Sequence, residues 1–366
     1  MRLSSTLSMY IGRHFLAGFG VLFLLFLAMI LMFDIVELLR RAAPRPNITF
    51  LTVLQMAFLK LPNMGEQVFP FAALCGGMVA FWRLTRHHEL VVARATGISA
   101  WQFLLPVLAI AFVLGILKIT VLNPFASALL SKYDRLEAVL MKGQSSSVAL
   151  SSSGLWLRQS NATGQSVIHA KRMVPRASTV EIGDVTVFTY EGVDKFIGRI
   201  EADEARLEDG FWHLIDVRLL SPETPTQIEA EYWLETDLTL AKILDSFAAP
   251  ETVSFWMMPE FIATLEKAGF SAVHHRLRWH SLLAAPLLLC AMVLIAATFT
   301  LRHARRGGTT FVVTMGVLTG FVFYFFSDLV FALGLSDSIP VTLAAWTPSG
   351  VTTLLGLAML LHLEDG

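Results

Sequence analysis

Six long apolar runs constrain the fold of this 366-residue chain more than any other feature. An α-helix needs about 20 apolar residues to cross about 30 Å of hydrocarbon, and each run has about that length. Because the bilayer core offers no water to pair with backbone polar groups, runs of this kind predict transmembrane helices. The six runs are Phe15–Phe33, Pro62–Trp82, Ile98–Val121, Leu282–Leu301, Thr310–Leu333 and Val341–Leu363.

The composition also favours a membrane protein. Hydrophobic residues make up 55% of the chain and charged residues 16%, whereas soluble proteins carry about a quarter charged residues. The formal net charge of −1 gives no reason to expect nucleic acid as a partner. The run Phe15–Phe33 is longer than a signal-peptide core and no small-residue cleavage site follows it, so we expect it to remain as a span. Cys75 and Cys290 lie in separate apolar runs, which favours buried thiols over a disulfide.

A polar interval separates the first three runs from the last three. Its segments VTVFTYEG (185–192) and IEAEYWLETDL (228–238) are rich in β-branched and aromatic residues, and the second alternates apolar and polar positions. Six or seven such segments, separated by turn residues, predict an all-β sandwich or jelly roll. We therefore expect three parts: spans one to three in residues 1–122, a β domain with flanking helices in 123–279, and spans four to six in 280–366.

The orientation follows from the excess of lysine and arginine that short cytoplasmic loops carry. The loop after Trp82 and the loop around Arg302–Arg306 are compact and basic, so we place them in the cytoplasm. The β insert then faces outward. This choice leaves Arg40, Arg41 and Arg45 on the outer side, where they need a separate explanation.

The segment HHELVVARATG (87–97) predicts a short helix in a loop between two spans. Val91 and Ile98 fall near one apolar face, and Glu89 and Arg94 lie at its margins. One interpretation is a helix that lies on the lipid headgroups. The other is a coupling helix, about residues 85–98, that docks into a motor protein. The chain has no phosphate-binding G-x-x-x-x-G-K-[ST] motif, so any ATPase must be a separate chain.

The sequence shows no pattern typical of catalysis. It has no H-E-x-x-H motif, and cysteine never recurs at the short spacing of a metal site. The β insert has no nucleophile–base motif, which argues against a membrane-bound enzyme with a β-domain active site. We therefore expect no catalytic residue, no metal and no cofactor in this chain.

Several segments resemble the lipopolysaccharide-export permease family (LptF/LptG), and their order extends over nearly the whole chain. The form ELVVARATG and the GLW turn favour the LptG branch over the paralogous LptF branch. The resembling segments are YIGRHF (10–15), FPFAALCGGMVAFWRLTRHHELVVARATG (69–97), GLWLR (154–158), EADEARLEDGFWHLIDV (201–217), GFVFYFFSDLVFALG (320–334) and IPVTLAAWTPSG (339–350).

The resemblance implies a subunit of an ABC transporter in the bacterial inner membrane. Its expected partners are an LptF-type permease, two LptB-type ATPases that use ATP and magnesium, and an LptC-type β-jelly-roll protein anchored in the membrane. The expected function is extraction of lipopolysaccharide from the outer leaflet and its transfer to a periplasmic bridge. A mechanotransmission permease like FtsX or MacB is an alternative, but that class usually has four spans.

The resemblance also implies roles for particular residues. The segment 85–98 becomes the helix that couples to the ATPase, with the carboxylate of Glu89 meeting basic groups there. Outward arginines suit the phosphates of lipid A, because a guanidinium presents a planar fork of donors. The alternative for these basic residues is that they only anchor span ends at the interface. Asp34 departs from the family, whose members can carry lysine there. The candidate residues are Arg86, Glu89, Val91, Arg94 and Ile98 for coupling, and Arg40, Arg41, Lys132 and Arg135 for lipid.

Overall fold

The chain divides into two compact units in a computed structural model. The first unit contains residues 1–133, 254–256 and 273–366, and the second contains 134–253 and 257–272. The structure describes residues 5–44, 48–87, 89, 99–142, 147–151, 154–160, 164–175, 180–191, 195–208, 210–221, 225–236, 249–267, 271–303, 309–336 and 338–365.

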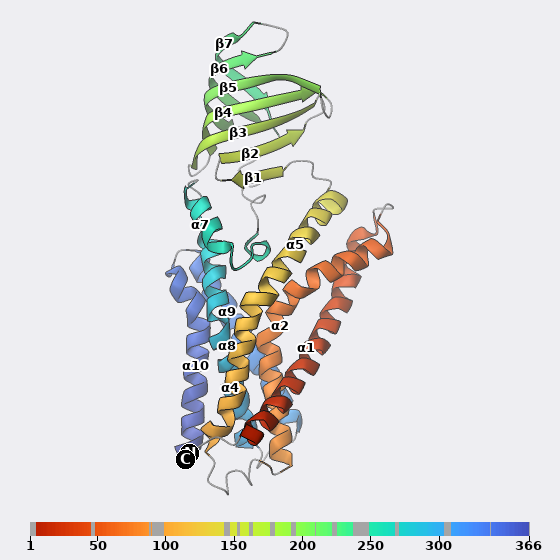
Figure 1. The fold of residues 1–366 in the computed structure, drawn as a ribbon, viewed down its shortest axis with the longest axis vertical. Helices are drawn as coiled ribbons and strands as arrows, with labels where there is room; N and C mark the ends of the chain where they lie inside the picture. Colours follow the sequence, from red (N-terminus) through yellow and green to blue (C-terminus); the bar gives the residue numbers. More distant parts are fainter. Residues whose placement is uncertain are drawn as a thin grey trace. The chain divides into compact units, whose positions relative to one another are not determined.

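The first unit is a bundle of long helices (Figure 1). Six stretches of helix in the described part of the chain are long and apolar enough to cross a membrane, which confirms the prediction of six spans. The third begins in α4, continues through the π-helical turn η1 and through α5, and ends in η2. The helices are α1 (Ser5–Ala42), α2 (Phe50–Arg86), α4 (Ala100–Leu117), η1 (Lys118–Leu122), α5 (Asn123–Glu137), η2 (Ala138–Lys142), α8 (Val273–His303), α9 (Thr309–Leu335) and α10 (Val341–Asp365).

Glycines let these helices pack with their backbones in contact. A Cβ atom on Gly76 of α2 would lie 2.7 Å from the backbone nitrogen of Phe19 on α1. A Cβ atom on Gly115 of α4 would clash with the Cα atom of Pro286 on α8. Small residues at such crossings are typical of membrane helices, which gain their association from close packing rather than from the hydrophobic effect.

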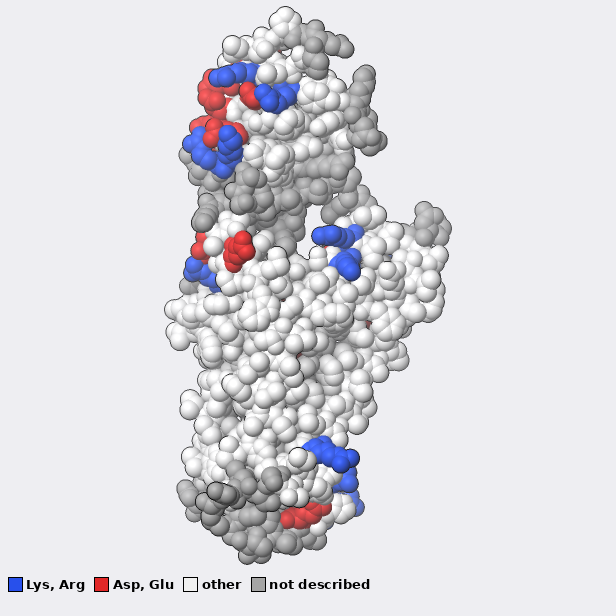
Figure 2. All heavy atoms as spheres, in the orientation of Figure 1, with Lys and Arg blue, Asp and Glu red and all other residues white. Residues whose placement is uncertain are grey.

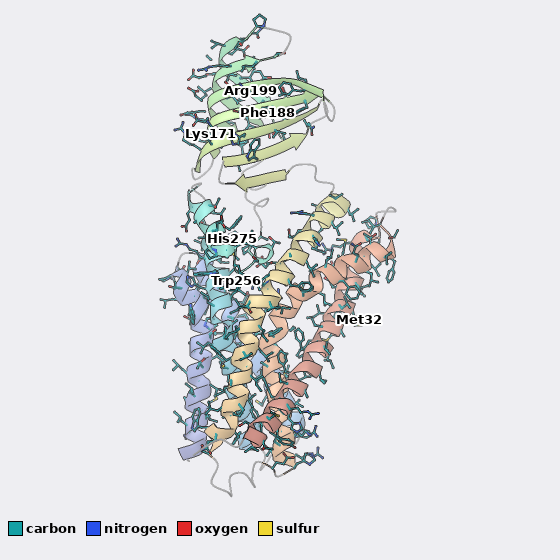
Figure 3. All side chains as sticks on the ribbon, in the orientation of Figure 1. Met32, Lys171, Phe188, Arg199, Trp256 and His275 are labelled. Carbon is teal, nitrogen blue, oxygen red and sulfur yellow. The ribbon has the colours of Figure 1, made fainter. Side chains whose placement is uncertain are left out.

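The helices differ widely in how much of their surface the chain itself covers. In the most apolar part of α8, 72% of the residues are buried, against 11% in α1 and 17% in α9. Met32 projects away from α1 on the outer side of the bundle (Figure 3). The face in Figure 2 shows a broad belt across the bundle without charged side chains. Helix α8 therefore forms the centre of the bundle, while α1 and α9 present apolar surface to lipid or to other chains.

The second unit contains one seven-stranded antiparallel sheet with its strands in sequence order. This confirms an inserted all-β domain. The connectivity is a meander, and the sheet shows none of the Greek-key crossovers of a jelly roll among its described strands. The strands are β1 (Ser147–Ser151), β2 (Gly154–Ser160), β3 (Gly164–Pro175), β4 (Val180–Glu191), β5 (Lys195–Glu208), β6 (Phe211–Leu220) and β7 (Gln227–Glu235), and this unit also holds η3 (Pro250–Thr252) and α7 (Met258–Lys267).

A crease across β4, β5 and β6 lets this single sheet bury its own core. The register aligns Asp184, Asp203 and Asp216 at one level of the three strands, and we call this row the crease. Asp184 and Asp216 have φ angles of 52° and 56°, in the left-handed region that aspartate tolerates better than most side chains. In each strand the alternation of inward side chains shifts by one residue there.

Side chains from both sides of the crease belong to one buried cluster. Trp212 and Leu214 come from one side and Val187 and Val217 from the other, and each is at most 1% exposed. A flat sheet without a covering layer leaves both faces wet, so burial this complete requires the sheet to curve over itself, as Figure 1 shows. The two layers expected of a sandwich are here supplied by one continuous sheet.

Candidate functional site

The expected coupling segment lies largely outside the described residues. Val91, Arg94 and Ile98 are not described, so their expected roles stay predictions. Arg86 ends α2 and places its guanidinium over the Trp82 ring, 5.0 Å from the ring centroid. Glu89 accepts a hydrogen bond of 3.1 Å from the hydroxyl of Tyr10 on α1. The carboxylate of Glu89 thus contacts α1.

The two arginines at the far end of α1 share one carboxylate. Arg40 donates two hydrogen bonds of 3.0 Å to Glu37, one from Nε and one from Nη2. Arg41 Nε lies 3.7 Å from Glu37 Oε1. These groups are partly to largely exposed, with 77% of the Arg40 side chain accessible. A phosphate that binds here must displace or share Glu37, because the fork of Arg40 is already engaged.

A second ion pair occupies the inner part of the same region. Lys60 Nζ on α2 lies 2.6 Å from Asp34 Oδ1 on α1, with both side chains largely buried. The Lys60 ammonium also faces the Tyr133 ring of α5, 5.7 Å from its centroid. Asp34 therefore neutralises a neighbouring lysine and links α1 with α2.

The other two basic candidates lie on α5. Lys132 is exposed and adjoins Tyr133, so it lies near the Asp34–Lys60 pair along the helix. Arg135 is also exposed, in the last turn of α5, and falls in the second unit. The structure therefore brings Asp34, Lys60 and Tyr133 together.

A buried polar cluster was not predicted from the sequence. Glu66 of α2, whose side chain is 1% exposed, accepts a hydrogen bond of 2.7 Å from Arg278 Nη2 on α8. Asn123 Nδ2 donates to the same Glu66 oxygen at 3.3 Å. Asn123 Oδ1 in turn accepts a bond of 2.8 Å from the backbone N–H of Phe255. The Glu66 carboxylate thus joins α2, α5, α8 and the segment 254–256 of the first unit.

Lys118 adds a second cation to this cluster. It lies in η1, is buried, and places its ammonium 5.9 Å from the centroid of the Phe69 ring. It is within electrostatic range of both Glu66 and Arg278, so two cations face one carboxylate. Glu66 Oε1 and Arg278 Nε have no hydrogen-bond partner. Buried charge in excess of its counterions is costly, and π-helical turns are frequent at functional positions.

A sequence signal for the cluster existed. Glu66 and Lys118 are the charged residues inside the second and third apolar runs, and an ionisable group inside a span is a candidate functional residue by default. The partner of Glu66 is 212 residues away, however, and no local pattern connects Arg278 with it. Among the described residues, no group of three or more His, Cys, Asp or Glu side chains is arranged to hold a metal ion.

Comparison with known proteins identifies the family. The family model described as lipopolysaccharide export system permease LptF/LptG matches residues 9–362. The chain belongs to this family. The lipopolysaccharide export system permease protein LptG of Escherichia coli K12 is 25% identical over 313 residues, which cover 83% of this chain and 84% of that relative. LptG of Haemophilus influenzae is 21% identical over 359 residues, which cover 94% and 95%.

The family match confirms the resemblance seen in the sequence segments. The chain is a permease of the lipopolysaccharide export system, an inner-membrane protein that works within a transporter complex. The family is one of transport subunits, and it implies no catalytic role for this chain. Six spans also argue against the four-span mechanotransmission class.

Proposed function

We propose that this chain is the LptG-type subunit of the complex. In this role it pairs with an LptF-type permease, and two LptB-type ATPases bind and hydrolyse ATP with magnesium on the cytoplasmic side. An LptC-type protein then receives the lipid. The observation that carries this proposal is the family match over residues 9–362, together with the LptG names of the relatives.

The structure supports a substrate-contacting role for the first span. Helix α1 leaves most of its apolar surface uncovered, as a helix bordering a lipid path must. Its far end carries Arg40 and Arg41, and the Asp34–Lys60 pair lies one or two turns before them. In this proposal lipopolysaccharide phosphates bind Arg40 and Arg41, assisted by Lys132 and Arg135, and compete with Glu37 for the guanidinium groups.

The proposed orientation puts the β unit in the periplasm. Two single-cysteine variants test it: Ile228→Cys on the sheet, where the side chain is 80% exposed, and His87→Cys at the end of α2. In whole cells an impermeant thiol reagent is expected to label the first variant and to spare the second. The reverse pattern would overturn the orientation and the proposed phosphate role of Arg40.

The proposed coupling role centres on Glu89. In a groove of the ATPase lined with basic side chains, Glu89→Arg places like charges together and weakens assembly. On lipid headgroups the same change is harmless or favourable, because anionic lipids attract arginine. Copurification of the ATPase with the tagged permease, and lipid-stimulated ATP turnover, measure the difference. Normal values in both assays would remove Glu89 from the coupling contact. Tyr10→Phe is the matched control, since it removes only the hydroxyl that binds Glu89.

A further inference from the structure

A groove lies between α1 and α2 at the end of the bundle that carries Arg13 and Arg83. It encloses about 260 Å³ and is lined mostly by small and apolar side chains. Successive turns of both helices line the groove. The lining residues are His14, Ala17, Gly18, Val21 and Leu22 from α1, and Val79, Ala80 and Arg83 from α2. The groove is thus apolar along its length, with one arginine and one histidine at one end.

Glycine packing fixes the shape of this groove. Gly18 is part of the lining, and a Cβ atom added to it would lie 2.8 Å from the carbonyl oxygen of Gly76 on α2. The two backbones therefore touch directly beside the groove and cannot approach further. The exposed side chain of Val79 forms one wall without taking part in the core. Backbone contact between the two helices therefore bounds the groove at Gly18.

The charged end of the groove is basic. Arg83 is exposed, and no acidic side chain pairs with it in the part of the chain that the structure describes. Arg13 and Arg86 are exposed nearby on the same two helices. The one described carboxylate close by, Glu89, is engaged by the hydroxyl of Tyr10, and Tyr10 also packs edge-on against His14 with ring centroids 4.5 Å apart. An anion at this end would meet a guanidinium that has no ion-pair partner among the described residues.

We propose that this groove binds one anionic phospholipid, with an acyl chain along the apolar lining and the phosphate at Arg83. Under the orientation proposed above, the groove opens to the cytoplasmic leaflet. Basic pockets between membrane helices on that side are suited to anionic headgroups, whose negative surface potential attracts arginine. The complementary charge decides against a zwitterionic lipid, and the length of the apolar lining decides against a free phosphate ion. This lipid is a structural ligand, separate from the exported substrate.

The test uses the intact transporter complex reconstituted in nanodiscs with equal amounts of phosphatidylglycerol and phosphatidylethanolamine. After transfer to mild detergent, native mass spectrometry counts the phospholipids that stay bound. Wild type is expected to retain phosphatidylglycerol in preference. Arg83→Gln removes a charge-assisted contact and is expected to lower retention at least about tenfold. Arg83→Lys keeps the charge and is expected to restore part of the retention. Arg218→Gln, which changes an exposed arginine on β6 of the other unit, is expected to leave retention unchanged.

A second variant tests the apolar part without touching charge. Val79→Trp fills the groove from an exposed position, so the fold is kept and phosphatidylglycerol is expected to be lost as with Arg83→Gln. Equal retention of both lipids by wild type would overturn the proposal, as would unchanged retention in both Arg83→Gln and Val79→Trp. A photoreactive benzophenone side chain at Val79 gives a separate readout. Crosslinking to phospholipid supports the site, and crosslinking to another protein chain shows that the groove is a subunit interface instead.

Discussion

Helices α8 and α1 are both long and apolar enough to cross the membrane, but the rest of the chain covers most of α8 and little of α1. In the most apolar part of α8, 72% of the residues are buried. Near its start α8 carries Arg278, which pairs with the buried carboxylate of Glu66. In the most apolar part of α1 only 11% of the residues are buried. Helix α1 carries Arg40 and Arg41, which form exposed ion pairs with Glu37. The comparison teaches that hydropathy reports membrane crossing alone. What a span contributes to the protein depends on which neighbours cover it.

The largest expected effect is loss of the buried carboxylate. Glu66→Leu removes the carboxylate that faces the buried Lys118 and the partly buried Arg278, and breaking a buried pair in this way costs about 3–5 kcal/mol. The thermal midpoint of the detergent-purified protein, followed by size-exclusion chromatography after heating, is expected to fall by many degrees. The matched change Glu37→Leu on α1 is expected to leave the midpoint nearly unchanged. Equal effects of the two variants would contradict the conclusion that the buried pair of Glu66 stabilises the fold more than the exposed pairs of Glu37.

Glycine substitutions probe the same contrast through packing. Gly115→Val pushes a side chain into the backbone of α8 at Pro286 and is expected to cost about 1–3 kcal/mol as an overpacked contact. Gly20 of α1 has no atom within 4 Å of an added Cβ, so Gly20→Val is its control. The yield of monodisperse protein and its thermal midpoint measure both. A well-tolerated Gly115→Val would show that α4 and α8 are less tightly packed than the structure has them.

Removal of the buried cation Lys118 is expected to stabilise the fold. Lys118→Met keeps the length of the side chain and its contact with Phe69, and it removes a buried ammonium that lies within electrostatic range of a second cation, Arg278. The expected gain is about 1–3 kcal/mol, seen as a raised thermal midpoint. Lipopolysaccharide-stimulated ATPase activity of the complex, measured in parallel, shows whether transport needs the Lys118 ammonium. A lowered midpoint would mean that Lys118 and Glu66 support each other in the folded state.

The smallest effect on stability is expected at the exposed end of α1. The double variant Arg40→Ala and Arg41→Ala removes surface pairs that water already screens, so the thermal midpoint is expected to stay where it is. Lipid stimulation of ATP hydrolysis is expected to fall, because phosphate binding loses its donors. Normal stimulation would favour the interpretation that these arginines only anchor the span end.

The sequence predicted the spans and the β insert because both depend on local patterns. In lipid, a helix pairs all the backbone N–H and C=O groups of an apolar run of about 20 residues, so such a run predicts a helix. Alternation of apolar and polar residues, such as that of β7, indicates a strand. The Glu66–Arg278 and Asp34–Lys60 pairs were not predictable in this way, since their partners are 212 and 26 residues apart. The crease was hidden for a different reason. A one-residue shift of alternation at Asp184 looks like noise in one strand, and only the register shows that it recurs in its neighbours.

The crease has a consequence for how the β unit tolerates change over evolutionary time. Deleting one residue beside Asp216 would turn Trp212 and Leu214 outward relative to Val217, while β4 and β5 kept their old phase. The inward and outward positions of the three strands are therefore coupled to one another at this level. Gains and losses of residues at this level are expected to occur in all three strands together or in none, whereas the turns between the strands are free to change length.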